Sequence, residues 1–227
     1  MTSAGPGRPR KQQPVRPGAT ARDEILDAAA ELFTNQGFAN TSTRAIADAV
    51  GIRQSSLYHH FGTKDDILAE LLDGTVAGGL AFASTIHASP PPSDSGTAAA
   101  RLHAVALYDG SQLCSARWNL GVLYHLPEAR APRFQRFMDD RLQLRRLYQE
   151  LGQNVEEFTP AGHRQGTPSL GDLLFRLVES LINLRADGLV GPDSAMQTAD
   201  AGIALAGMAA DLDEVRAVSA GLIRQFG

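Results

Sequence analysis

The stretch STRAIADAVGIRQSSLYHHFGTKDDIL, residues 42–68, decides the fold of the N-terminal part of this 227-residue chain. Apolar residues recur at helical spacing over 45–50, and Gly51 then ends that helix. A second short helix is predicted over 54–60, with Leu57 among its buried residues. Two short helices around a tight turn form a helix-turn-helix, in which the second helix can enter the major groove of DNA.

The second helix of this motif and the residue before it would expose polar side chains without a carboxylate: Arg53, Gln54, Ser55, Ser56, Tyr58, His59 and His60. A carboxylate there would repel phosphate, so its absence favours a nucleic-acid partner. Adjacent histidines point about 100° apart on a helix, which makes them poor joint metal ligands. We therefore predict that one of the two contacts DNA and the other packs in the core.

Six short motifs, in order and at fixed spacing, resemble the DNA-binding domain of the tetracycline-repressor (TetR) family. They are Gly37-Phe38, Thr41-Ser42, Ile46-Ala47, Gly51-Ile52, Leu57-Tyr58-x-His60-Phe61 and Lys64-Asp65-x-x-Leu68. The resemblance covers about the first third of the chain. Three residues depart from those common in the family, namely Ala45, Arg53 and Ser55. Arg53 and Ser55 lie at the second helix of the motif, called the reading helix because it would enter the major groove.

The resemblance implies that residues at the start of the first motif helix and along the second motif helix contact DNA. They are Ser42, Thr43, Arg44, Arg53, Gln54, Ser55, Ser56, Tyr58, His59 and His60, with Lys64 meeting phosphate. The chemistry agrees, because Arg44 can bind guanine and Gln54 can bind adenine with two hydrogen bonds each, while hydroxyls can hold phosphates. Two alternatives stay open: Ser42 as a pure helix cap, and the arginines as exposed charges.

The charge of the chain is divided unevenly along its length. Residues 1–64 carry eight Lys/Arg and five Asp/Glu, a net charge of +3, whereas residues 65–227 carry 13 and 20, a net charge of −7. The basic part is where phosphate would be met. Within it, residues 1–19 read as a disordered basic arm, in which Arg8, Arg10 and Lys11 resemble an AT-hook core. They would enter a minor groove or merely form a solvated tail.

The sequence predicts an all-α chain. The helix-turn-helix DNA-binding domain spans 20–66, and a larger helical effector-binding and dimerisation domain spans 67–227. A helix capped by Thr20 and ended by Gly37 comes first, and a long helix over 64–86 carries interior glycines at which we predict a bend or a break. Later helices are predicted over 98–115, 117–125, 132–152, 170–187, 194–210 and 212–225.

A wide apolar stripe on the late helices predicts a homodimer interface formed by Leu170, Leu174, Leu177, Leu181, Ile203 and Met208. The alternative is a single-chain core. The resemblance implies a four-helix interface made by two late helices of each chain, and two-fold symmetry would duplicate the reading helix on a palindrome.

Aromatic and polar residues on the middle helices are candidates for an effector pocket: His103, Tyr108, Cys114, Trp118, Phe137, Phe175 and Arg176. They equally fit an ordinary core. A single cysteine excludes an internal disulfide, and neither the histidines nor Cys114 show metal-ligand spacing.

We therefore expect a ligand-responsive transcription regulator, most simply a dimeric repressor that binds a palindromic double-stranded DNA operator and is released by a largely apolar small molecule. No catalytic constellation, cofactor or metal site is predicted. The chain would act in the bacterial cytoplasm at the nucleoid, and we expect no apolar run long enough to cross a bilayer. The alternatives are a constitutive DNA-binding protein without an effector and a small-molecule-binding helical protein with no DNA role.

Overall fold

The computed structural model describes residues 16–159 and 168–226, and every regular element in these ranges is helical. The chain divides into two compact units, Met1–Leu68 and Ala69–Gly227. Three predicted DNA-arm residues, Arg8, Arg10 and Lys11, lie outside the described residues.

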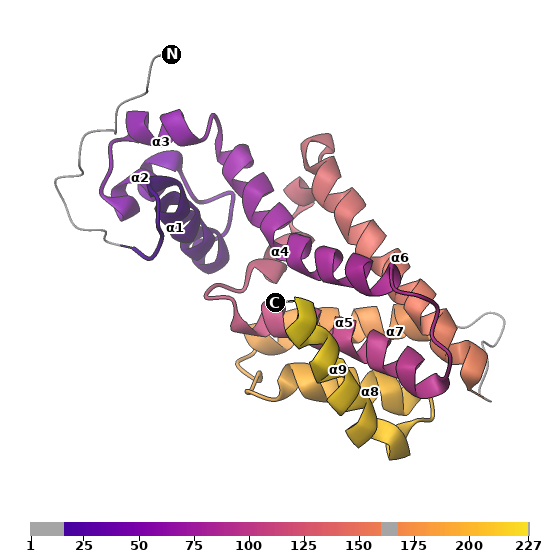
Figure 1. The fold of residues 1–227 in the computed structure, drawn as a ribbon. Helices are drawn as coiled ribbons and strands as arrows, with labels where there is room; N and C mark the ends of the chain where they lie inside the picture. Colours follow the sequence, from indigo (N-terminus) through magenta and orange to yellow (C-terminus); the bar gives the residue numbers. More distant parts are fainter. Residues whose placement is uncertain (1–15, 160–167, 227) are drawn as a thin grey trace, which may run out of the picture. The chain divides into compact units, whose positions relative to one another are not determined.

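The first unit packs three helices, α1 (Ala21–Gln36), α2 (Thr43–Val50) and α3 (Gln54–His60), with the start of α4 (Lys64–His87) (Figure 1). The predicted caps are confirmed. The Thr20 side chain accepts a hydrogen bond from the backbone N–H of Asp23, and the Asp23 carboxylate accepts one from the backbone of Thr20. The core of this unit is made of fully buried apolar side chains, among them Ile25, Ile46, Leu57 and Leu68.

Of the predicted bend or break in α4, the break does not occur, because the helix continues through Gly74, Gly78 and Gly79. A β-carbon at Gly79 would lie 2.8 Å from a carboxylate oxygen of Asp109, and one at Gly78 would meet the Gln112 side chain. These two glycines therefore allow α4 to approach polar side chains of the next helix.

The expectation that no apolar run could cross a bilayer is also corrected by α4. By length and composition alone, this helix is long and apolar enough to cross a membrane. The core helix of a soluble protein can have the same length and composition, and α4 is partly buried inside the structure.

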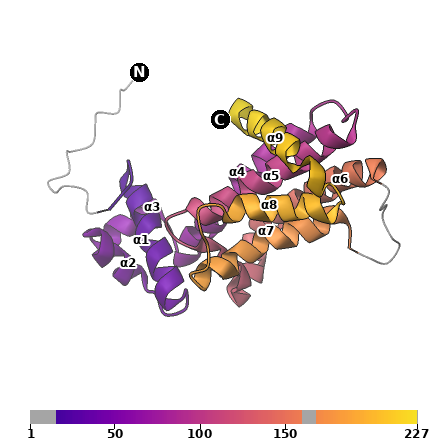
Figure 2. The ribbon, with the colours of Figure 1, turned by 90° about the horizontal axis from the view of Figure 1, so that it is seen from below.

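The second unit surrounds α5 (Ser95–Ser115), which packs against α6 (Gln135–Phe158), α7 (Leu170–Ala186), α8 (Ser194–Leu205) and α9 (Leu212–Phe226) (Figure 2). Short 3₁₀ turns occupy Leu120–His125, Pro127–Arg130, Pro132–Phe134 and Ala209–Asp211.

Three predicted helices of the second unit differ from the structure, and the one predicted over 132–152 is α6, which runs from Gln135 to Phe158. The segment predicted as a helix over 117–125 contains a 3₁₀ turn instead, with the Asn119 amide bonded to the carbonyl of Ile182 at 2.8 Å. Helix α8 ends at Leu205 rather than near residue 210. Gly207 follows with φ 84°, a left-handed conformation that does not continue a helix.

Helices α6 and α7 meet at a pair of glycines. A β-carbon at Gly171 would overlap the carbonyl oxygen of Tyr148, and one at Gly152 would lie 2.8 Å from the α-carbon of Gly171. Backbone therefore packs directly on backbone at this crossing, and neither position has space for a side chain.

Candidate functional site

The turn between α2 and α3 is built by local hydrogen bonds. The Ser42 hydroxyl accepts from the backbone N–H of Ala45 at 3.0 Å, which caps α2. Gly51 ends α2 in the left-handed conformation, with φ 72° and ψ 30°. The N–H of Ile52 then bonds back to the carbonyl of Ala47 at 3.0 Å. This closes the turn and starts α3 at a defined angle to α2.

Helix α3 exposes the polar face that the sequence predicts. Leu57 is fully buried, while Tyr58 is 48% exposed, and Gln54 and Ser55 are also exposed. Ser56 is half-buried. None of the seven residues of this helix carries a carboxylate.

Three of the predicted DNA-contacting residues meet in one hydrogen-bond network. The Gln54 amide nitrogen donates to the Thr43 hydroxyl at 2.9 Å, and that hydroxyl lies 3.1 Å from the Tyr58 hydroxyl. A residue at the start of α2 thus holds two exposed side chains of α3. This network orients the Gln54 amide and restricts its rotamers before any DNA is present.

The prediction that one of the adjacent histidines packs in the core is wrong, because His59 and His60 are both exposed. Leu57 inside α3 and Phe61 directly after it already fill the buried positions. Sequence spacing placed these two apolar residues correctly but did not exclude a third buried side chain.

Lys64 has a structural contact that competes with its predicted phosphate contact. Its ammonium donates to the carbonyls of Phe38 at 2.7 Å and Thr41 at 2.8 Å, and it lies 4.2 Å from the centre of the Phe38 ring. Two of its three donor hydrogens are therefore used to hold the turn between α1 and α2.

The remaining predicted residues of this region are exposed, and two arginines were missed. Arg44 and Asp48 form a loose pair at 3.8 Å with both side chains largely in solvent, and Arg53 is exposed.

The two arginines that the sequence did not predict are Arg16 and Arg22. Arg16 donates to the Ala49 carbonyl at 3.0 Å and pairs with acidic residues of α1. Arg22 donates to the carbonyl of His60 at 2.7 Å. Both contacts join distant parts of the chain, which periodicity does not report.

The seven residues predicted for one effector pocket lie in several separate environments. His103 is fully buried, with its ring nitrogens 2.9 Å from the Ser219 hydroxyl and 3.1 Å from the Asp200 carboxylate. Tyr108 packs on the rings of Phe82 and Phe226.

The other candidates are equally dispersed. Phe137 packs on Tyr124, and Phe175 packs on Tyr148. Arg176 is exposed and pairs with Glu179 at 2.7 Å, while Cys114 and Trp118 are half-buried. These contacts do not support the prediction of a single pocket lined by all seven, because aromatic side chains on buried helix faces serve as core.

Most of the residues predicted for the dimer interface are buried within the single chain, which corrects that prediction. Leu170, Leu174, Leu181, Ile203 and Met208 are each at most 6% exposed, and Leu177 is half-buried. The apolar stripe of α7 covers more than one face, because Leu181 lies beside Gly110 of α5 while Leu174 lies beside Gly202 of α8. The leucines left in solvent on α7 and α8 are Leu173, Leu184 and Leu205, at 41%, 37% and 59% exposure.

A buried carboxyl group lies at the centre of the second unit. The Tyr148 hydroxyl donates to Asp109 at 3.0 Å, and Asp109 is only 6% exposed. Burial raises the pKa of Asp109 to about 7; the Tyr148 hydrogen bond opposes this rise, and the charge of Glu179 adds to it. The folded chain therefore retains a proton on Asp109 at pH values where an unfolded chain has released it.

Replacing Asp109 with asparagine is expected to remove a pH dependence of stability. Between the unfolded pKa near 4 and the folded pKa of about 7, only the folded state binds this proton, so the free energy of unfolding falls as pH rises. The wild-type chain should lose roughly 2–3 kcal/mol between pH 5 and pH 7.5 that Asp109→Asn does not lose. Urea denaturation at both pH values measures this difference. Asp213→Asn, at a fully exposed carboxylate, is the control, and parallel pH profiles for Asp109→Asn and wild type would contradict the assignment.

Comparison with known proteins agrees with the geometry of the first unit. The family model for bacterial regulatory proteins of the tetR family matches residues 25–71. The solved structure of AmtR from Mycobacterium smegmatis is 50% identical, with a TM-score of 0.83 over 92% of this chain and 97% of that chain. This chain belongs to the TetR family.

Other TetR-family relatives match less of the sequence. The transcriptional repressor KstR2 of Rhodococcus jostii is 51% identical over 53 residues, which are 23% of this chain. The chain spans about a quarter, 26%, of the length of this curated relative. The solved structure of KstR2 from Mycobacterium tuberculosis, a ketosteroid transcriptional regulator, is 26% identical with a TM-score of 0.63, covering 84% and 94% of the two chains. The chain thus carries the DNA-binding unit of TetR-family transcription regulators.

Proposed function

We propose that this TetR-family chain is a ligand-responsive repressor, which binds a palindromic operator as a homodimer and is released by a small molecule. The observation that supports it most is the exposed face of α3, with Gln54 and Tyr58 both held by Thr43. Side chains that are oriented before binding lose little conformational freedom on contact with DNA. Such a regulator acts in the cytoplasm, at the nucleoid.

In this proposal α3 lies in the major groove and its N-terminal residues read base edges. Gln54 keeps its carbonyl oxygen and one amide hydrogen for adenine while the other hydrogen stays on Thr43. Arg44, exposed at the start of α2, binds guanine or phosphate, and the hydroxyls of Ser42, Ser55 and Ser56 hold phosphates. The histidines of α3 are both exposed and join this surface.

Replacing Gln54 with alanine is expected to relax sequence preference at one position of each half-site. The loss of a bidentate base contact should cost about 1–3 kcal/mol at the preferred base and little at other bases. Competition binding with operators varied at every position measures both quantities. An unchanged base preference with unchanged affinity would remove Gln54 from the reading surface.

Thr43 provides the matched control for this test. Thr43→Val keeps the shape of the side chain but removes the hydroxyl that holds Gln54 and Tyr58. We expect it to reproduce part of the relaxed preference, whereas Thr43→Ser retains the hydroxyl and the preference. If valine and serine behave alike, then the hydroxyl does not position Gln54.

The dimer part of the proposal rests on the leucines that the fold leaves in solvent. Leu173, Leu184 and Leu205 are exposed on α7 and α8, which lie side by side in Figures 1 and 2. Leu173 and Leu184 are three helical turns apart, so they lie on one face of α7, with half-buried Leu177 between them. An apolar face of this kind suits a two-fold interface between copies of the chain.

The regulatory part of the proposal uses α4, which begins in the first unit and ends in the second. A ligand that binds the second unit changes the DNA-bound population only through its different affinities for the DNA-competent and released states.

The deciding experiment is selection of bound fragments from genomic DNA by the purified full chain, followed by footprinting. A protected pseudo-palindrome with two half-sites supports the dimeric regulator. Enrichment without a shared motif would favour a general DNA binder. No enrichment at low salt would contradict the proposal and favour a helical ligand-binding protein without a DNA role.

A further inference from the structure

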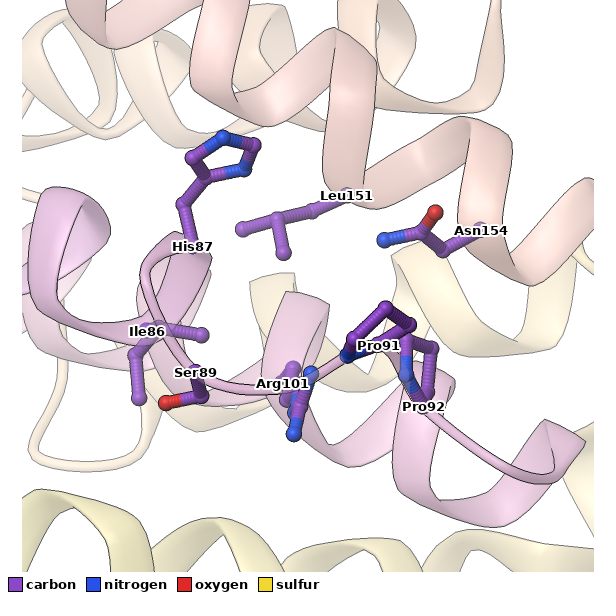
Figure 3. A pocket seen from close by; sticks show the side chains of 8 residues that line it. All are labelled: Ile86, His87, Ser89, Pro91, Pro92, Arg101, Leu151 and Asn154. Carbon is purple, nitrogen blue, oxygen red and sulfur yellow. The ribbon is translucent and has the colours of Figure 1, made fainter.

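A pocket with a volume of about 180 Å³ opens between the end of α4, the loop that follows it, α5 and α6. All of its lining residues belong to the second unit. Figure 3 shows Leu151 and Asn154 of α6 facing the loop that carries Ser89 and the two prolines. None of the residues that the sequence suggested for an effector site lines it.

Among the polar side chains that line this pocket, Arg101 is the one that can only donate hydrogen bonds. Arg101 donates one N–H to the carbonyl of Pro90 at 2.7 Å, which ties its guanidinium to the loop. Among the described residues this is the one hydrogen bond made by its five N–H donors, so further donors remain available. Half-buried Asn154 turns its side-chain amide toward the pocket in Figure 3.

The charges around the pocket favour an anion. Arg101 is the one lining residue with a permanent charge. His87 lies on the opposite side, and its imidazole is 3.4 Å from the carboxylate of Glu150, with both side chains about half exposed. Glu150 does not line the pocket, whereas the Arg101 guanidinium belongs to its lining.

The rest of the lining is apolar and the space is small. Ile86, Leu151, Pro91 and Pro92 provide hydrocarbon surface on several sides. A fully hydrated inorganic anion gains nothing from such walls, whereas a short hydrocarbon chain does. The volume is below that of pockets for drug-sized ligands.

We propose that this pocket binds a small organic carboxylate, with the carboxylate on Arg101 and Asn154 and the hydrocarbon part against Leu151 and Ile86. A guanidinium and a carboxylate form paired, charge-assisted hydrogen bonds. Because few atoms are buried, the dissociation constant lies in the range of about 10 μM to 1 mM.

The position of the pocket connects it to regulation. Ile86 and His87, the last two residues of α4, line the pocket. The same helix starts at Lys64 in the DNA-binding unit. A carboxylate bound here orders the end of α4 and the following loop, and so acts as the effector. This regulatory part rests on the proposed repressor function.

Titration calorimetry on the full chain, with hexanoate and benzoate as probes, tests the binding site. We expect one carboxylate bound per chain, with hexanamide and inorganic phosphate each at least about tenfold weaker than hexanoate. Absence of hexanoate and benzoate binding up to about 10 mM would overturn the proposal. Phosphate binding as tight as hexanoate would overturn the assigned ligand class.

Variants place the probe in the pocket. Arg101→Gln should weaken hexanoate at least about tenfold, whereas Arg146→Gln, at an exposed position of α6, should not change it. Asn154→Leu replaces the amide with a side chain of similar volume and leaves the hydrogen bond from Arg101 to Pro90 in place. This variant tests the site if Arg101→Gln does not fold. Unchanged binding in Asn154→Leu and in folded Arg101→Gln would overturn the site.

DNA binding is then measured with and without hexanoate. Release of operator by hexanoate in wild type but not in Arg101→Gln supports the effector role. Tight hexanoate binding without any effect on DNA overturns that role and leaves the carboxylate site intact. Failure of the chain to bind any DNA contradicts the proposed function, and the calorimetric result stands independently of it.

Discussion

The variant Leu205→Glu is expected to be a monomer that binds operator at least about a hundredfold more weakly than the wild-type chain. Leu205 is 59% exposed at the end of α8, on the face where the proposed two-fold interface forms. An unpaired carboxylate buried at this interface opposes association of the two chains. A monomer contacts only one half-site of the operator, so it binds the operator more weakly. Sedimentation analysis gives the oligomeric state, and gel-shift titration gives the operator affinity.

The matched control for this prediction is Leu142→Glu. Leu142 is 43% exposed on α6, away from the α7 and α8 leucines in sequence, and it has the same chemistry. We expect this variant to remain dimeric and to bind operator normally. A dimeric Leu205→Glu with unchanged operator affinity would place the interface elsewhere.

The variant Gly171→Ala is expected to lose about 3 kcal/mol or more of unfolding free energy. Its new β-carbon would overlap the backbone carbonyl of Tyr148 and force α7 away from α6. Backbone atoms in a helix cannot move aside as a side chain can. The separation would disturb the buried contact between Phe175 and Tyr148 as well. Chemical denaturation, with the midpoint and the slope both recorded, measures the loss.

Gly74→Ala is the control for that variant, and it should change stability in the opposite direction. Gly74 lies inside α4, and no atom outside its own helix lies within 4 Å of an added β-carbon. Alanine there should stabilise the chain by about 0.5–1 kcal/mol through helix propensity. If Gly171→Ala and Gly74→Ala have the same effect, then the close crossing of α6 and α7 does not exist in solution.

Sequence alone predicted the first unit almost residue by residue. The bounds of α3, the Thr20 and Ser42 caps and the Gly51 turn were all predicted from local pattern. Each depends on hydrogen bonds and helical spacing within a few residues, so the information is contained in the same short stretch. The exposed polar face of α3 follows from the same spacing, once Leu57 is assigned to the core.

The second unit could be predicted only in outline. Its helices were found, but Leu174 and Leu181 were assigned to an interface between chains and are buried within one chain. Apolar residues cover more than one face of α7, and periodicity does not say which face meets a partner within the chain. The seven candidate residues for an effector pocket do not line one common pocket, because helical spacing does not say which helix faces meet.

Local pattern therefore determined most of the helical segments, the caps and bounds of the short helices in the first unit, and which of these helices exposes a polar face. Only the tertiary structure decided that Lys64 is bonded to two carbonyls and that Gly171 lies against the backbone of α6. It also decided that Arg101 of α5 and Asn154 of α6 line the same pocket. Each of these contacts joins residues far apart in the chain, and their pairing is set by how whole helices pack rather than by any local spacing.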